Sequence, residues 1–215
     1  MNHFLNGKSN KEIPHHKQMI IGSCGPACVI MFLKYFKSKI RITKRLELRL
    51  WSKSWLIPFG ATDEYGLGYS LGINNIKAEV ITENIDFRLN PKSPIMKMFC
   101  RIFGKSIERT HRYNRNKALE SGIKEKVSNI NLNLIQNLLK EKTYLIIMVD
   151  QSKYISDDKY KQGILHWIVV TGYDKMFRIN DPDIGQIEIT PDELEKSMEL
   201  KFNFGIDKRM IVIRE

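Results

Sequence analysis

A change in hydrophobic period divides this sequence into a helical first part and a strand-forming second part. Directly after Gly25-Pro26, residues 27–36 read ACVIMFLKYF and are apolar on nearly every side of a helix. Proline suits the first turn of that helix because its missing N–H has no intrahelical partner there. We therefore expect a central helix that other elements cover on several sides.

The second part of the chain consists of short β-branched and alternating runs, which are typical of strands. The expected strands cover residues 145–149, 166–173, 177–180, 186–189 and 210–213. A tight turn at Asp174-Lys175 joins two of them, and Thr190 is placed to cap a helix that begins at Pro191. Helices followed by a mostly antiparallel sheet predict an α+β fold.

Between these two parts the periodicity predicts further helices and one short strand. The expected helices cover residues 44–51, 65–73, 95–103, 109–126 and 132–139, and the strand covers residues 78–81. Thr43 is the expected cap of the first of these helices. In the second, Gly66, Gly68 and Gly72 allow the backbone to pack closely against its neighbours.

Basic residues gather in two blocks of the chain. The formal net charge of +11 divides into +9 over residues 1–53, −4 over 54–87, +8 over 88–126 and −2 over 127–215. Such blocks attract nucleic acid, anionic lipid or acidic peptides, or they form a solvated lysine-rich face, which base rates favour. Aromatic residues within 88–126 are too sparse to stack bases, so a nucleic-acid partner is not expected.

Length and composition favour one ordinary globular domain. The 215 residues are 42% hydrophobic, so we expect a single domain over 1–215 with a basic helical insertion at about 88–126. Three cysteines are too few for a disulfide scaffold. No apolar stretch approaches the roughly 20 residues of a membrane span, and the polar N-terminus lacks the apolar core of a signal peptide. These features predict a cytoplasmic protein and leave its oligomeric state open.

Cys24 is the first candidate for chemistry because it stands at the start of the predicted central helix. The positive end of a helix dipole stabilises a thiolate and lowers the pKa of a cysteine from about 8.5. A nucleophilic cysteine also needs a hydrogen-bond donor for the oxyanion. Gln18 lies on a short loop before Gly22-Ser23, so its side-chain amide can fold back beside the sulfur.

His166 and Asp181 form the second candidate group. His166 opens one expected strand and Asp181 ends the next, so a hairpin would bring the imidazole and the carboxylate together. Asp183 is the alternative partner of the imidazole. Each residue alone has an ordinary structural explanation, but the ordered set with Cys24 and Gln18 is much less expected by chance.

The remaining cysteines and histidines are expected to be structural. Cys28 and Cys100 are interpreted as core thiols. His15, His16 and His111 lack partners at the spacing of metal ligands, and we expect them on the surface. The sequence therefore predicts neither a metal ion nor an organic cofactor.

Three segments resemble the thirty-ninth family of cysteine peptidases, a papain-like group that trims double-glycine leaders from bacteriocin precursors. They are Q-x5-C-G-P-A at 18–27, H-W-I-V-V-T-G-Y-D at 166–174 and N-D-P at 180–182. L-E-L-R-L-W at 46–51 and E-Y-G-L-G-Y-S-L-G-I at 64–73 resemble a stand-alone branch, whose members are sometimes encoded near ATP-grasp peptide ligases. The likeness is most specific at the cysteine and histidine segments.

The resemblance implies a papain-like fold in which the cysteine helix packs on the sheet that carries the histidine. It also implies roles, with Cys24 as the nucleophile and His166 as the general base and then acid. Asp181 would orient His166, and Gln18 would donate to the oxyanion beside the backbone N–H of Cys24. The expected reaction is hydrolysis of a peptide or isopeptide bond through a thioester acyl-enzyme.

Other functions stay open at this point. An amine can capture the same acyl-enzyme, which would make the protein a transpeptidase or acyltransferase. A protein that keeps the groove without catalysis would be a peptide-binding module, and nucleic-acid binding through residues 88–126 is a hypothesis that rests on charge alone. The basic blocks, taken with the ligases near the resembling branch, predict that the substrate segment beside the cut is acidic.

Overall fold

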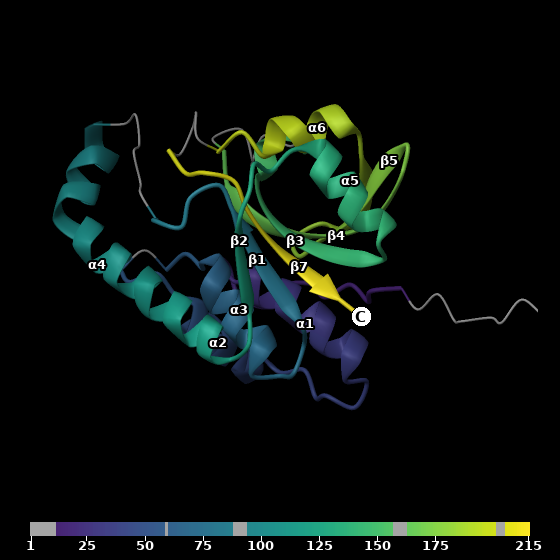
Figure 1. The fold of residues 1–215 in the computed structure, drawn as a ribbon, viewed down its shortest axis with the longest axis horizontal. Coiled ribbons are helices and arrows are strands. Elements are labelled where there is room, and N and C mark those ends of the chain that lie inside the picture. Colours follow the sequence, from purple (N-terminus) through teal and green to yellow (C-terminus); the bar gives the residue numbers. More distant parts are fainter. Residues whose placement is uncertain (1–11, 59, 88–93, 157–162, 201–204) are drawn as a thin grey trace, which may run out of the picture.

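The computed structural model describes residues 12–58, 60–87, 94–156, 163–200 and 205–215. The start of the first basic block and residues 88–93 of the second lie outside the described residues. The described residues form a central sheet with helices on both of its faces (Figure 1). No helix in this part of the chain is long and apolar enough to span a bilayer.

The seven-stranded sheet has the order β2-β1-β7-β3-β4-β5-β6. Its strands are β1 (Ala78–Thr82), β2 (Lys124–Val127), β3 (Thr143–Asp150), β4 (Leu165–Asp174), β5 (Met176–Asp181), β6 (Gly185–Ile189) and β7 (Arg209–Arg214). All neighbouring strands are antiparallel except β1 and β2. The meander from β3 to β6 was predicted from the β-branched and alternating runs.

Helices cover the two faces of the sheet separately. They are α1 (Cys24–Phe36), α2 (Lys44–Ser54), α3 (Glu64–Gly72), α4 (Pro94–Glu120), α5 (Leu132–Lys140), α6 (Pro191–Ser197) and the short 3-10 helix η1 (Gln151–Lys153). The helices α1, α2 and α3 lie on one side of the sheet, and α5 and α6 lie on the other (Figure 1). Because strand residues alternate in direction, Ile146 and Met148 of β3 join the core under α1 and α3, whereas Ile147 joins the core under α5 and α6.

The helix α1 is the buried centre of the helical layer. Its residues from Cys24 to Leu33 are all buried, and it packs against α2, α3 and β4. Burying a nearly all-apolar helix on several sides removes most of its surface from water, which is the main stabilising contribution to such a core. The predictions of a covered central helix and of an α+β fold are confirmed.

Local sequence signals set several element boundaries as predicted. Thr43 Oγ1 accepts a 3.1 Å hydrogen bond from the N–H of Leu46 at the start of α2. Thr190 forms a reciprocal capping box with Glu193 at the start of α6. In α3, a side chain at Gly66 would collide with the backbone of Ser54, so the absence of a Cβ is what lets α2 and α3 approach.

The basic segment differs from its predicted elements. Residues 94–120 form one continuous helix, α4, where two helices were expected, and residues 124–127 form the edge strand β2. Gly104 does not interrupt α4, because a glycine inside a helix costs only about 1 kcal/mol. The strand β2 has no apolar pattern because it pairs with β1 at the exposed edge of the sheet. That residues 88–126 are an insertion into one domain stays a prediction.

Candidate active site

Cys24 is the first residue of α1, and Ser23 is the N-cap residue before it. The side chain is 8% exposed and lies where the start of α1 meets the sheet. A Cβ at Gly25 would lie 2.5 Å from Oγ1 of Thr62, so glycine is what permits this close contact. The indole N–H of Trp167 on β4 donates to the carbonyl oxygen of Thr62 at 3.2 Å, which ties the helix start to the strand.

The hairpin of β4 and β5 brings His166 and Asp181 together. His166 is the second residue of β4, Asp181 is the last residue of β5, and the two strands are antiparallel neighbours. Nε2 of His166 lies 2.9 Å from Oδ1 of Asp181, and both residues are buried. Of the two carboxylates considered from the sequence, Asp181 is the one that forms this hydrogen bond.

The thiol of Cys24 interacts directly with the imidazole of His166. Because Asp181 engages Nε2, the ring nitrogen left for the sulfur is Nδ1. The structure therefore joins Cys24, His166 and Asp181 in one buried chain of contacts, although Cys24 and His166 lie far apart in the sequence.

This contact lowers the pKa of Cys24 and raises the pKa of His166, and both shifts favour an ion pair. Burial by itself would raise the pKa of Cys24, but the charge and hydrogen bond of His166, with backbone groups of Trp167 and Gly25, hold that pKa below its ordinary 9.0. Burial would lower the pKa of His166, but the Cys24 thiolate and Asp181 raise it to about 10. The two shifts together favour a thiolate beside an imidazolium over the neutral pair.

The second oxygen of Asp181 is held by residues that follow β3. The hydroxyl of Tyr154 donates to Oδ2 at 2.8 Å, and Nε2 of Gln151 donates to the same atom at 3.1 Å. Burial would raise the pKa of Asp181, but the hydrogen bonds it accepts, first from His166, lower that pKa and keep the carboxylate ionised. Sequence reasoning missed Tyr154 and Gln151, which lie in a polar loop without any motif.

Gln18 lies on the loop that leads to Cys24 and contacts the chain just after β5. Its backbone N–H donates to the carbonyl oxygen of Pro182 at 2.8 Å. Its side-chain Oε1 is enclosed and has no hydrogen-bond partner within the described ranges. A buried acceptor without a partner is costly, so this oxygen is placed to accept a hydrogen bond from a bound molecule.

Comparison with known proteins places the chain in a family. A profile described as "Peptidase_C39 like family" matches residues 13–199. The chain belongs to this family. The crystal structure of a putative C39-like peptidase from Bacillus anthracis is 11% identical and has a TM-score of 0.50 over 94% of each chain, which shows the same fold. The sequence resemblance and the papain-like fold are thereby confirmed.

Two further similar proteins have names that describe different activities. A double glycine motif protease from an AMS/PCAT transporter, solved in complex with the leader peptide, has a TM-score of 0.48 at 16% identity and covers 96% of each chain. Guanylyl cyclase 1 of Arabidopsis thaliana is 25% identical over 228 residues, which are 97% of this chain and 78% of that protein.

In this member of the Peptidase_C39-like family, His111 is buried, so the prediction that it lies on the surface was wrong. It is 4% exposed, with Nδ1 3.2 Å from Oδ2 of Asp63 and Nε2 3.1 Å from the carbonyl oxygen of Ile85. Only the charged imidazolium donates from both ring nitrogens, so these two oxygen partners favour that form of His111. Burial would lower the pKa of His111, but the hydrogen bond to Asp63 raises it. Its place is structural, beside the buried ion pair of Glu64 and Arg209.

His15 and His16 are also not surface residues, because the chain before Gln18 packs along the end of β5. Both are half-buried. Nε2 of His15 bonds to the backbone oxygen of Asp181 at 2.9 Å, and Nε2 of His16 lies 3.1 Å from Oε2 of Glu47. This N-terminal segment therefore contributes to holding the site.

The two other cysteines divide between the core and the surface. Cys28 is fully buried as predicted, and its thiol donates to the carbonyl oxygen of Trp167. Cys100 is only partly buried on α4, so its assignment to the core was wrong. Across the described ranges, no three His, Cys, Asp or Glu side chains are grouped so that they could hold a metal ion.

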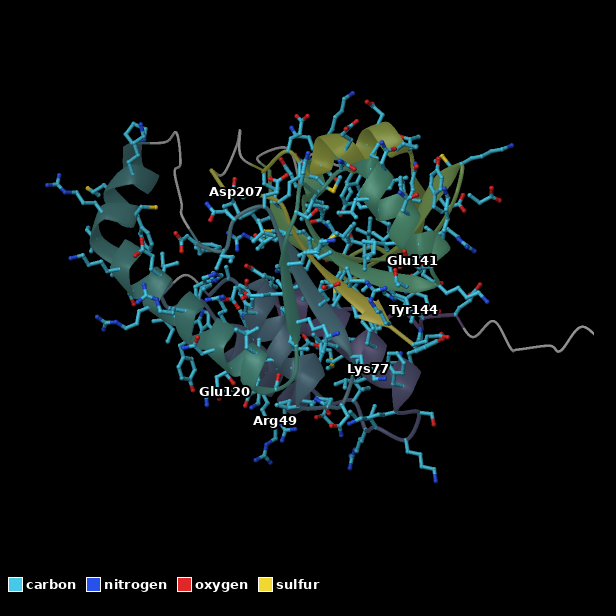
Figure 2. All side chains as sticks on the ribbon, viewed as in Figure 1. Arg49, Lys77, Glu120, Glu141, Tyr144 and Asp207 are labelled. Carbon is cyan, nitrogen blue, oxygen red and sulfur yellow. The ribbon has the colours of Figure 1, made fainter. Side chains whose placement is uncertain are left out.

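The basic residues of 94–126 lie on α4 and β2. The helix α4 packs on α3 and β2, and the strands β1, β7 and β3 separate β2 from β4. On α2, Arg49 points outward from the molecule (Figure 2). Lys17 is the exposed basic residue directly beside Gln18.

Proposed function

We propose that this protein is a cysteine peptidase that hydrolyses a peptide or isopeptide bond through a thioester acyl-enzyme. Cys24 is the nucleophile, His166 transfers the proton, Asp181 orients His166, and Gln18 donates to the oxyanion. The observation that carries the proposal is the contact of Cys24, at a helix start, with an imidazole whose other nitrogen lies 2.9 Å from Asp181. Membership of the Peptidase_C39-like family supports the same class of reaction.

In the acylation step, the thiolate of Cys24 attacks the carbonyl carbon of the substrate and forms a C–S bond. The carbonyl π electrons move to oxygen, and the oxyanion accepts hydrogen bonds from the backbone N–H of Cys24 and the amide of Gln18. As the tetrahedral intermediate collapses, the C–N bond breaks, and the imidazolium of His166 gives its proton to the leaving amine. The products are a free amine and a thioester.

In the deacylation step, His166 is neutral and acts as the general base. It takes a proton from water as the hydroxide oxygen bonds to the thioester carbon, and collapse of the second intermediate breaks the C–S bond. The acid product leaves, and the thiolate and imidazolium are restored. Asp181 stays ionised throughout because its hydrogen bonds keep its pKa low.

The test uses peptide turnover together with labelling of Cys24. We expect iodoacetamide to alkylate Cys24 faster than a model thiol at pH 7, and Cys24→Ala to abolish turnover. Cys28→Ala is the matched control, because Cys28 is a buried cysteine one helical turn away. Substrates are taken from a peptide library with read-out by mass spectrometry. A Cys24 that reacts no faster than a model thiol, with turnover unaffected by Cys24→Ala, would overturn the proposal.

The same experiment separates the competing functions. Products that carry an added amine, such as hydroxylamine, in preference to water identify an acyltransferase with the same residues. Peptide binding that survives Cys24→Ala without any turnover identifies a binding module. Reactions with GTP are included because the Arabidopsis relative is called a guanylyl cyclase. Formation of cyclic GMP that is indifferent to Cys24→Ala would point to a chemistry outside the proposed site.

The substrate of the proposed reaction is a peptide or protein with an acidic segment beside the cut. Lys17, exposed and adjacent to Gln18, is the basic residue best placed to meet such a segment. A reducing compartment such as the cytoplasm suits the reaction, because Cys24 has to remain a free thiol. Filter binding of RNA and duplex DNA at two salt concentrations tests the remaining charge-based hypothesis.

A further inference from the structure

Glu47 is a fully buried carboxylate that the proposed reaction does not use. It lies on α2, within a run of basic and leucine residues, and has no exposed surface. Burying an ionised carboxylate is unfavourable unless several donors replace the lost water. The donors that surround Glu47 therefore indicate what it holds in place.

All of those donors come from the loop that leads to Cys24. Oε1 of Glu47 accepts hydrogen bonds from the N–H of Met19 at 2.8 Å and the N–H of Ile20 at 3.1 Å. The same oxygen accepts a short hydrogen bond from the hydroxyl of Ser23, and Oε2 lies 3.1 Å from Nε2 of His16. One carboxylate thus fixes the chain on both sides of Gln18 and just before Cys24.

Apolar packing does little to hold this loop. The side chain of Ile21 is 94% exposed and that of Met19 is 39% exposed, so neither contributes much to the core. A loop with few buried apolar contacts depends on hydrogen bonds for its conformation. A separate hydrogen bond, to the carbonyl oxygen of Pro182, holds the N–H of Gln18.

Glu47 also remains ionised in this setting. Burial by itself would raise its pKa, but the hydrogen bonds from His16, Ser23 and the N–H of Met19 lower it. Charge-assisted hydrogen bonds are stronger than neutral ones, so the anchor is available over the range in which a thiolate enzyme works.

We infer that Glu47 is a positioning residue that sets the loop carrying Gln18, and so builds the oxyanion site for Cys24. This inference rests on the proposed function. It predicts that Glu47 acts on transition-state stabilisation through Gln18 and leaves the nucleophile itself intact.

The experiment compares Glu47→Ala, Gln18→Ala and the double variant in the full-length protein. Removing one oxyanion donor costs about 100-fold in kcat, and we expect Glu47→Ala to approach the loss of Gln18→Ala with little change in KM. The double variant should be no slower than Gln18→Ala, because the two residues act in one unit. Alkylation of Cys24 by iodoacetamide forms no oxyanion, so its rate should stay within about 3-fold of wild type.

Two further variants keep the test decisive if Glu47→Ala folds poorly. Glu47→Gln retains an acceptor oxygen and should restore kcat to within about 10-fold of wild type. When it is combined with Gln18→Ala, kcat should be no lower than in Gln18→Ala alone. Glu64→Gln is the matched control, since Glu64 is an equally buried helix carboxylate that bonds to Arg209. It should lower stability and leave kcat per folded enzyme unchanged.

The outcomes separate this inference from the proposed function. Losses that multiply in the double variant, parallel slowing of alkylation, or an unaffected kcat in Glu47→Ala would each overturn the role of Glu47 while the peptidase stands. Absence of turnover by the wild-type enzyme, with an unreactive Cys24, would overturn the proposed function and this inference with it.

Discussion

The hydroxyl of Tyr154 donates a 2.8 Å hydrogen bond to Oδ2 of Asp181, the carboxylate oxygen that does not face His166. Tyr154 follows η1 in the connection between β3 and β4, so a segment outside the hairpin supports the carboxylate that bonds to His166. Asp181, the hydrogen-bond partner of His166, is therefore also held by a residue outside the β4–β5 hairpin.

Replacing Tyr154 with phenylalanine tests this support. Without the hydroxyl, the pKa of Asp181 rises and its carboxylate is positioned less firmly beside His166. We therefore expect kcat/KM to fall about 10-fold, which corresponds to the loss of about one hydrogen bond. The alkaline limb of the pH profile should move to higher pH, because a more basic carboxylate raises the pKa of His166 further. Tyr173→Phe is the control, since Tyr173 packs on Phe177 instead. An equal loss of kcat/KM in Tyr154→Phe and Tyr173→Phe would contradict the role of the Tyr154 hydroxyl in supporting Asp181.

Alanine replacements at Asp181 and Asp183 distinguish the two carboxylates left open by the sequence. Asp181→Ala removes the bond to His166 and should lower kcat/KM by about 100-fold, as expected for a misplaced catalytic group. Asp183→Ala keeps the backbone N–H that donates to Asp181 at 2.8 Å, and should cost less than about 3-fold. The reverse order of effects would assign the orienting role to Asp183.

The pH dependence of Cys24 alkylation follows from the ion pair. The pKa of Cys24 is lowered, so the thiolate is present below pH 9, and proposed turnover should fall as His166 loses its proton near pH 10. In His166→Ala, only the backbone groups of Trp167 and Gly25 still oppose the effect of burial on the thiol, so the acid limb of the alkylation rate should move to higher pH. Stopped-flow labelling from pH 5 to 11 measures both limbs. An unchanged acid limb in His166→Ala would exclude the ion pair.

Local contacts were the part of the site that the sequence could predict. The helix start at Gly25-Pro26 and the hairpin that joins His166 to Asp181 both depend on neighbours close in the chain. By contrast, Cys24 and His166 come together only through the packing of α1 on β4, and the sequence indicated that contact through family resemblance.

Residues whose role depends on tertiary burial were missed. In L-E-L-R-L-W, Glu47 looks like an ordinary charged residue on a solvated helix. Its hydrogen-bond donors come from the loop that folds over it, and the helix sequence does not indicate that contact. For His111 a signal did exist. Ile107, His111 and Ala118 share one face of α4 and are all buried, so the histidine belonged to the apolar stripe.

The ion pair of Glu64 and Arg209 should matter for stability more than for turnover. Both side chains are almost fully buried, and Arg209 also lies over the ring of Phe87 at 4.7 Å. Glu64→Ala leaves a buried guanidinium unpaired and should reduce the free energy of unfolding by about 3–5 kcal/mol. Replacing both residues with methionine should recover most of that loss. Urea unfolding measures both variants, and a double variant no more stable than Glu64→Ala would contradict the explanation.

Lys17 gives the acidic-substrate proposal a specific residue. If a substrate carboxylate passes Lys17 beside Gln18, Lys17→Glu should lower kcat/KM for acidic peptides about 5-fold at low salt and favour matched basic peptides. Arg49→Glu is the control, because Arg49 points away from the molecule (Figure 2). The difference should fade between 0.01 M and 0.15 M salt, as the Debye length falls from about 30 Å to about 8 Å. Equal rates on acidic and basic peptides at every salt concentration would mean that the lysines form only a solvated face.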